Sequence, residues 1–165
     1  MNPIAYGASG LRQQALLRHI KIREGFKDHV YRDNVGKLTA GTGHLLTEEE
    51  LKIYYHGARV SSSVLEQWLE EDLAKALSAS REQVWFIPGA TVKFEDALVS
   101  VNFQLGTRWY NKFPTAWKHL INGEWKRANL EIKYVKEGSD QFSRWYKQTP
   151  VRVEDFMLAI ENLGK

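Results

Sequence analysis

A glutamate, an aspartate and a threonine stand at spacings that suit acid–base chemistry on a glycosidic bond. Eight residues separate Glu24 from Asp33, and five separate Asp33 from Thr39. Hydrolysis of such a bond requires one carboxyl group that keeps its proton near neutral pH and a second that stays ionised. The residue types therefore allow Glu24 to act as the acid, while Asp33 and the Thr39 hydroxyl hold a water molecule.

The elements expected around these residues give the two carboxyl groups different surroundings. Apolar spacing predicts a helix over residues 10–24 that places Glu24 on the same face as Leu17 and Ile20. Burial on that face and the negative end of the helix dipole should both raise the pKa of Glu24. Asp33 lies in a polar turn, where backbone N–H groups favour the charged carboxylate.

A small β region is expected after this first helix. Residues 29–31 and 37–40 are predicted to form short strands of a hairpin or three-stranded sheet. A capping-box sequence at Thr47 then predicts a short helix that ends near Gly57.

Long helices are expected in the rest of the chain. A second capping-box sequence at Ser63 predicts a helix that continues to about Trp85, where Pro88-Gly89 follows. Periodicity, prolines and glycines then predict helices or helical turns over residues 93–105, 114–123, 125–135, 142–146 and 150–163.

The fold class predicted from this pattern is α+β and mainly helical. We expect one domain over residues 1–165, in which a β-containing N-terminal lobe covers about 10–62. A connecting helix at about 63–85 leads to an all-helical lobe at about 90–165. A cleft between two such lobes would be a natural place for a polymer to bind.

His44 and Asp72 are expected to form an ion pair close to the site. His44 could serve as a general base, but a structural role is the preferred interpretation. Asp72 shares the apolar side of its predicted helix with Leu65 and Trp68, and a carboxylate in that position needs a partner. We therefore predict a His44–Asp72 bridge.

The composition excludes several classes of protein and site. Without cysteine, the chain has no disulfides, thiol catalysis or Cys-ligated metal centres. The five histidines show no ligand-like spacing, so we expect no metal and no cofactor; they are His19, His29, His44, His56 and His119. The first ten residues lack the basic and apolar regions of a secretory signal, and no 18-residue uncharged stretch predicts a membrane span.

A mild positive charge would suit an anionic polymer. Lys and Arg number 23 against 20 for Asp and Glu, and the isoelectric point is near 9.0. Such a field favours nucleic acid or a bacterial wall, although an ordinary solvated surface carries the same balance. The chain also holds six Trp, seven Tyr and seven Phe, which build cores and can stack on sugar rings or bases.

Three longer segments accompany the Glu-x8-Asp-x5-Thr spacing. The stretch GTGHLLT follows at residues 41–47, residues 97–106 run from Ala-Leu to Phe-Gln-Leu-Gly, and SRWYKQTP occupies residues 143–150. Together these motifs resemble the phage lysozymes of glycoside hydrolase family 24, and are most similar to those of the T-even phages. The resemblance covers most of the chain.

The resemblance implies a two-lobed lysozyme fold and assigns roles by position. Glu24 becomes the general acid, Asp33 the base or electrostatic partner, and Thr39 a residue that positions water. Leu45 and Phe103 fall where relatives line saccharide subsites, although core packing would explain both residues almost as well.

The chain also departs from the family pattern. Ala116 and Glu131 stand where relatives offer polar cleft contacts. Residues 133–142 look like an insertion, and about ten N-terminal residues are extra. These differences concern subsite details rather than the chemistry.

The function that the resemblance implies is that of an endolysin. Such a muramidase cleaves the bond between N-acetylmuramic acid and N-acetylglucosamine and lyses the host. We expect a monomer, made in the host bacterial cytoplasm, that reaches the wall in the periplasm after a separate holin permeabilises the membrane.

Three other functions are alternatives to this one. A tail-associated lysozyme would be expected as one domain of a longer chain. A wall-binding domain without activity is disfavoured by the intact Glu24, Asp33 and Thr39. A nucleic-acid-binding module is the weakest candidate, because the net charge of +3 is small and no binding motif is present.

Overall fold

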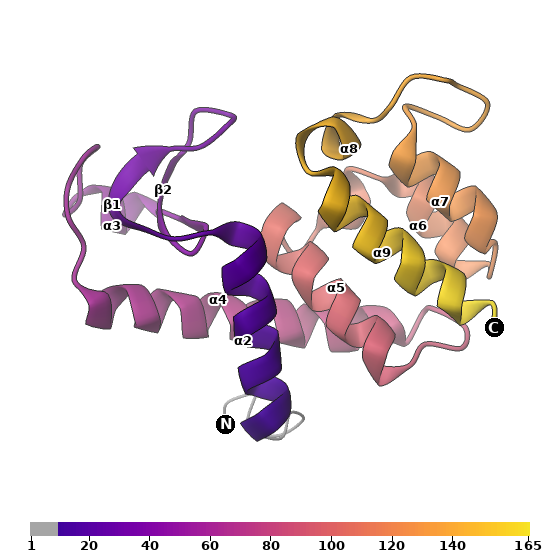
Figure 1. Cartoon of the computed structure of the whole chain (residues 1–165), viewed down its shortest axis with the longest axis horizontal. Coiled ribbons are helices and arrows are strands. Elements are labelled where there is room, and N and C mark those ends of the chain that lie inside the picture. The colour runs from indigo at the N-terminus through magenta and orange to yellow at the C-terminus, as the bar shows by residue number, and fades with distance from the viewer. Residues whose placement is uncertain (1–9) are drawn as a thin grey trace. The chain divides into compact units, whose positions relative to one another are not determined.

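The computed structural model describes residues 10–165 (Figure 1), and the chain divides into two compact units whose boundary falls within one helix. The first unit ends at Lys75 and the second begins at Ala76. Helix α4 (Ser62–Val84) contributes its first part to one unit and its last part to the other.

The first unit contains a small antiparallel sheet flanked by helices. Its elements are α2 (Gly10–Glu24), β1 (Lys27–Arg32), β2 (Leu38–Gly41), β3 (His44–Leu45), α3 (Glu48–Leu51) and the start of α4. The strands lie in the order β1-β2-β3, with Tyr31 opposite Thr39 and Ala40 opposite His44. The expected helix over residues 10–24 and the three-stranded sheet are both confirmed.

The sheet packs its apolar face on the beginning of α4. Side chains from β1, β2 and the segment before α4 meet Leu65 and Trp68 in a buried cluster. Gly41 marks how close this packing is, since a Cβ at Gly41 would stand 2.9 Å from Leu65 Cδ2. The sheet is therefore fixed against α4 within this unit.

Two helix boundaries in this unit differ from expectation. The capping box at Thr47 is present, but α3 ends at Leu51 rather than near Gly57. The following segment extends along β1 instead: Val30 N donates to Ala58 O at 2.9 Å, and Val60 N donates to Asp28 O at 2.9 Å. Helix α4 begins at Ser62, so the cap predicted at Ser63 is wrong.

The cap of α4 is formed two residues earlier. The Ser61 hydroxyl accepts a hydrogen bond from Val64 N at 3.4 Å, and Leu65 N donates to Ser61 O at 3.0 Å. Because three consecutive serines precede Val64, the sequence alone offers three candidate caps.

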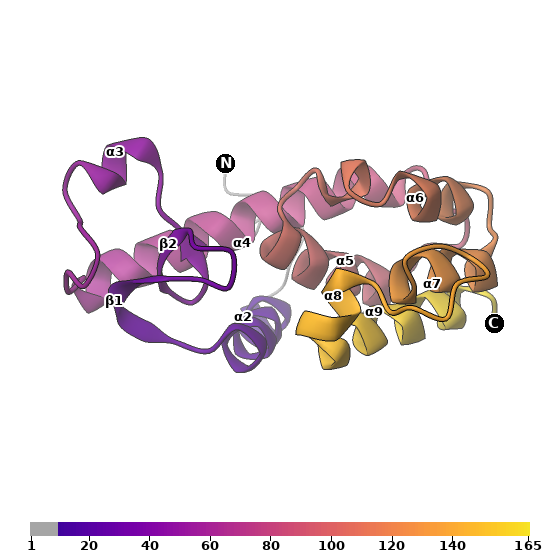
Figure 2. The same cartoon turned by 90° about the horizontal axis from the view of Figure 1, so that it is seen from above.

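The second unit is helical in its described residues. It comprises the end of α4, α5 (Val92–Leu105), the 3-10 helix η1 (Trp109–Asn111), α6 (Pro114–Ile121), α7 (Trp125–Lys133), α8 (Arg144–Gln148) and α9 (Pro150–Leu163). Figure 2 shows α9 beside α5 and α7. Their apolar faces enclose a core that includes Trp109 and Phe156.

The residues before α8 and α9 show why their ends are hard to predict. Helix α8 begins at Arg144 rather than near Phe142, because Ser143 caps it and Phe142 pairs with Tyr134 in an isolated bridge. Thr149 occupies the N-cap position of α9 without capping it by its side chain. The Thr149 hydroxyl instead donates to Trp145 O at 3.3 Å.

The predicted class, α+β and mainly helical, is confirmed. None of the helices among residues 10–165 is long and apolar enough to cross a bilayer.

Candidate active site

Glu24 is the last residue of α2 and is partly buried. It lies one turn beyond Ile20, which is 1% exposed, and the two residues share one face of the helix as predicted. The other buried residue of α2 is Leu16, whereas Leu17 is only partly buried, so that part of the expectation is corrected.

The Glu24 carboxyl group lies directly against Gly43. A Cβ at Gly43 would stand 2.8 Å from Glu24 Oε2 and 3.2 Å from Cδ. Gly43 closes the turn between β2 and β3 with φ of +71°, a conformation that glycine adopts without strain. Gly43 therefore provides both the turn and the space that the Glu24 carboxyl group occupies.

Asp33 is held by the backbone of its own turn. Its Oδ1 accepts hydrogen bonds from Val35 N at 3.0 Å and Lys37 N at 2.8 Å. No hydrogen bond from the described residues reaches Oδ2. One carboxylate oxygen is thus anchored, and the other is left for solvent.

Thr39 is 4% exposed and is linked to Asp33 through the main chain of Lys37. The Thr39 hydroxyl donates to Lys37 O at 3.2 Å, and the same carbonyl accepts from Asp33 N at 2.8 Å. The Thr39 proton is therefore directed at the backbone, so the hydroxyl can meet a water only through its lone pairs.

Tyr31 connects the two carboxyl groups electrostatically. Burial is the largest cause that raises the pKa of Tyr31, and the negative charges of Glu24 and Asp33 raise it further. Tyr31 also stands opposite Thr39 in the sheet, where paired residues point to the same face. Lys27 Nζ lies 4.1 Å from the centroid of the Tyr31 ring. Thr39 is thus the strand partner of Tyr31, and the charges of Glu24 and Asp33 both act on the Tyr31 hydroxyl.

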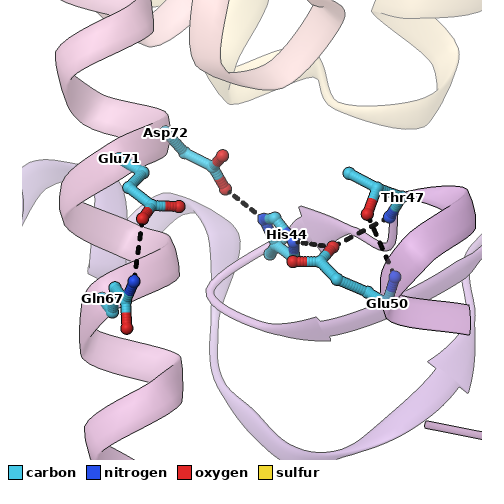
Figure 3. A network of polar contacts seen from close by, with 6 residues as sticks. All are labelled: His44, Thr47, Glu50, Gln67, Glu71 and Asp72. Atoms are coloured by element: carbon cyan, nitrogen blue, oxygen red, sulfur yellow. Dashed lines mark hydrogen bonds and ion pairs between the residues drawn. The ribbon is translucent and has the colours of Figure 1, made fainter. Parts of the chain in front are cut away.

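His44 forms the predicted contact with Asp72, together with a second one that was not predicted. Its Nδ1 lies 2.7 Å from Asp72 Oδ2, and its Nε2 lies 2.7 Å from Glu50 Oε1 (Figure 3). The imidazole is 9% exposed and stacks on Trp68 at 4.4 Å between ring centroids. Through His44, strand β3 therefore contacts both α3 and α4.

Burial and charge act in opposite directions on this histidine. Burial disfavours the imidazolium, but the hydrogen bonds and charges of Asp72 and Glu50 outweigh burial and raise the pKa of His44. Burial of Glu50 opposes its ionisation too, but the backbone N–H of Thr47 and the imidazole of His44 outweigh it and lower the pKa of Glu50. Glu50 thus both caps α3 and pairs with His44.

The remaining predicted positions differ in how exposed they are. Leu45 on β3 is 49% exposed, so core packing does not explain it. Phe103 on α5 is partly buried and lies outside the core cluster described for its unit. Ala116, which was aligned with a polar cleft position, is 1% exposed and belongs to that core.

Sequence reasoning missed three residues of this site. Gly43 is part of the GTGHLLT motif, Tyr31 ends a predicted strand, and Glu50 stands three residues after Thr47 in the capping box, but none of these patterns predicts the contacts that the three residues make. The alternation of β1, which puts Tyr31 two residues before Asp33, is a signal that could have identified Tyr31.

Comparison with known proteins gives two matches. The profile of the phage lysozyme family matches residues 21–150, a range that includes Glu24, Asp33 and Thr39. The chain is also 28% identical over 155 residues to "Probable T4-type lysozyme 2" of Dictyostelium discoideum, with 81% of this chain and 85% of that protein covered.

Proposed function

Because this chain belongs to the phage lysozyme family and is a glycoside hydrolase of the lysozyme type, we propose that it cleaves the β-1,4 bond between N-acetylmuramic acid and N-acetylglucosamine in peptidoglycan. The observation that supports this most directly is that the Glu24 carboxyl group lies against Gly43 in the β2–β3 turn, while Asp33 is anchored through one oxygen only. The two carboxyl groups come from different elements, which suits one that protonates a bond and one that holds water.

In this proposal Glu24 donates its proton to the glycosidic oxygen as the bond from that oxygen to the anomeric carbon breaks. A water molecule held by Asp33 Oδ2 and the Thr39 hydroxyl attacks the anomeric carbon from the opposite face and loses its proton to Asp33. Solvent then returns a proton to Glu24 and removes one from Asp33. The fixed Oδ1 of Asp33 supports this role, because it leaves Oδ2 in a defined position.

Leu45, which offers an exposed aliphatic surface on β3, is proposed as a contact for a sugar ring. Phe103, a partly buried ring on α5 of the second unit, is proposed as a sugar contact from the resemblance to the family alone. Replacement of Leu45 by Ser should raise KM more than it lowers kcat, since binding contacts act on substrate and transition state alike.

Analysis of the cleavage products tests the proposed reaction. Purified peptidoglycan treated with the protein, reduced with borohydride and analysed by mass spectrometry should give fragments that end in reduced N-acetylmuramic acid. Glu24→Gln should lose about a thousandfold in rate, because general-acid help alone contributes roughly 10²–10⁴. Glu70→Gln, at an exposed position of α4, is the matched control and should keep full activity. Reduced N-acetylglucosamine ends, free stem peptides or an active Glu24→Gln protein would refute the proposal.

The proposed biological role is that of an endolysin. The protein would be a monomer made in the bacterial cytoplasm that reaches the periplasmic wall when a holin permeabilises the membrane. Cells that express it should stay intact until chloroform or a holin is added, and light scattering should give a mass near 19.1 kDa. Lysis without permeabilisation would show that the protein leaves the cytoplasm by its own route.

A further inference from the structure

One nitrogen of His119 and one carboxylate oxygen each from Glu131 and Glu137 lie within 4.8 Å of one another. His119 comes from α6, Glu131 from α7, and Glu137 from the segment between α7 and α8. Figure 1 shows α6 and α7 as neighbours in the second unit. Three segments of the chain therefore bring metal-binding residue types to one place.

His119 is oriented as metal-binding histidines commonly are. Its side chain is only 9% exposed, and Nδ1 lies 3.0 Å from Glu124 Oε1. Among the described residues, Nε2 has no hydrogen-bond partner. A histidine that gives one ring N–H to a carboxylate presents its other nitrogen to a metal with the required lone pair. Because Nε2 is not buried away from solvent, an ion can reach it.

Each of the two glutamates has one oxygen that is already engaged and one that is free of the contacts described. Glu131 Oε1 accepts from Glu137 N at 3.1 Å, and Glu137 Oε2 accepts from Arg127 Nε at 3.1 Å. These bonds restrain both carboxylates, and each carboxylate still has an oxygen that can coordinate an ion. Three candidate ligand side chains, each with a neighbouring contact that restrains it, therefore lie close together.

The local charge favours a divalent cation. Glu124, Glu131 and Glu137 carry three negative charges, and Arg127, which bonds Glu124 and Glu137, carries one positive charge. With His119 neutral, the group has a charge of about −2, which a divalent ion would cancel.

We propose that His119, Glu131 and Glu137 form a binding site for a divalent transition-metal ion, with Zn²⁺ as the best match. One imidazole nitrogen and two carboxylate oxygens suit Zn²⁺, whereas Ca²⁺ and Mg²⁺ prefer oxygen ligands alone. The remaining coordination position takes water. The ion would fasten α6, α7 and the segment around Glu137, which lies in the 133–142 stretch that departs from the family pattern.

The sequence-based expectation of no metal site rested on the spacing of histidines alone. His119 is twelve residues from Glu131 and eighteen from Glu137, so no local motif marks the group. Only the packing of α6 on α7 and the return of the chain after α7 bring the three residues together.

Titration of the whole protein with ZnCl₂ tests the site. Calorimetry at pH 7.5 should show one Zn²⁺ per chain, with MgCl₂ and CaCl₂ binding at least about tenfold more weakly. Glu137→Gln and Glu131→Gln should each weaken Zn²⁺ binding at least about tenfold. Arg127→Gln is the control for the ion pairs: it removes the Arg127–Glu137 and Arg127–Glu124 pairs but no ligand, so it should keep the Zn²⁺ binding that the two glutamate variants lose.

Nitrogen-15 NMR of the histidine rings locates the ion. The Nε2 resonance of His119 should move on addition of Zn²⁺, while those of the exposed His56 should not. Zn²⁺ should also raise the melting temperature of the native protein and of Arg127→Gln more than that of Glu137→Gln. The proposal is overturned if Glu137→Gln and Glu131→Gln bind Zn²⁺ normally, if binding is absent, or if another histidine shifts instead of His119.

Discussion

Gly43 faces the Glu24 carboxyl group so closely that a methyl group on its α-carbon would stand 2.8 Å from Glu24 Oε2. The three atoms nearest to such a methyl group all belong to the Glu24 side chain, and none belongs to the backbone. The end of a glutamate side chain moves more easily than the backbone of a sheet. A side chain at Gly43 should therefore displace the carboxyl group of Glu24 and leave the turn in place.

Gly43→Ala should reduce activity by about a hundredfold or more while the protein stays folded. A displacement of a catalytic group by about 1 Å lowers the reaction rate by about this factor. An alanine at positive φ lowers the free energy of unfolding by roughly 1–2 kcal/mol. Gly57→Ala is the matched control, because Gly57 has φ of +89° with nothing within 4 Å of a Cβ. Both variants should lose similar stability, and only Gly43→Ala should lose activity. Equal activities of the two variants would contradict a role for this contact.

Asp33→Ala should lose most activity, because the proposed water loses its anchor at Oδ2. Asp33→Asn should keep more activity if the chief role of Asp33 is to position that water, since an amide oxygen can still accept the two backbone hydrogen bonds. The free energy of unfolding should change by no more than about 1 kcal/mol. Kinetics and thermal melts of both variants check this. An Asp33→Ala protein that unfolds readily but has normal specific activity when folded would make the residue structural.

The local elements of this site could be predicted from the sequence, but the approach of one element to another could not. The helix over residues 10–24, the strands and the Thr47 capping box follow from periodicity and residue type. The contact between Gly43 and Glu24 depends on how α2 meets the β2–β3 turn, which no local pattern encodes. The same holds for Glu50, whose capping signal is local and whose contact with His44 is not.

The His44–Asp72 contact could be predicted because it follows from the cost of leaving a buried carboxylate unpaired, and not from a local sequence pattern. A carboxylate on the apolar side of a helix requires a partner, and His44 was the candidate in the nearby β region. The helix end expected near Gly57 was wrong, because the segment after α3 forms backbone hydrogen bonds with β1, which the local pattern does not predict.

The hydrolysis is expected to invert the anomeric configuration. Inversion requires room for a water molecule between the substrate and the base, with the two carboxyl groups about 6.5–9.5 Å apart. The anchored Oδ1 of Asp33 supports a role in holding water rather than in attack. Proton NMR of the first-formed product from a soluble oligosaccharide measures the anomer directly. A product with retained configuration would identify Asp33 as a nucleophile.

The pairing of His44 with Asp72 and Glu50 should make the protein most stable at mildly acidic pH. The pKa of His44 is raised above 6.5, so its contribution is complete below 6.5 and is lost as pH rises through the folded value. The pKa of Glu50 is lowered below 4.5, so its contribution is present above 4.5 and is lost as pH falls through the folded value. The two effects overlap between about pH 4.5 and 6.5.

Asp72→Asn should therefore destabilise the protein more near pH 5.5 than near pH 9. At pH 5.5 the variant leaves an imidazolium with one charged partner instead of two, which should cost roughly 1.5–3 kcal/mol. As pH rises through the raised pKa of His44 toward 9, the imidazole loses its charge and less charge interaction remains to be lost. Glu71→Gln, which removes an exposed carboxylate one residue away, is the matched control and should change stability by less than about 0.5 kcal/mol at either pH. Urea unfolding at both pH values and NMR titration of His44 supply the measurements. A His44 pKa that is unchanged in Asp72→Asn would mean that the charge of Asp72 does not act on the imidazole in solution.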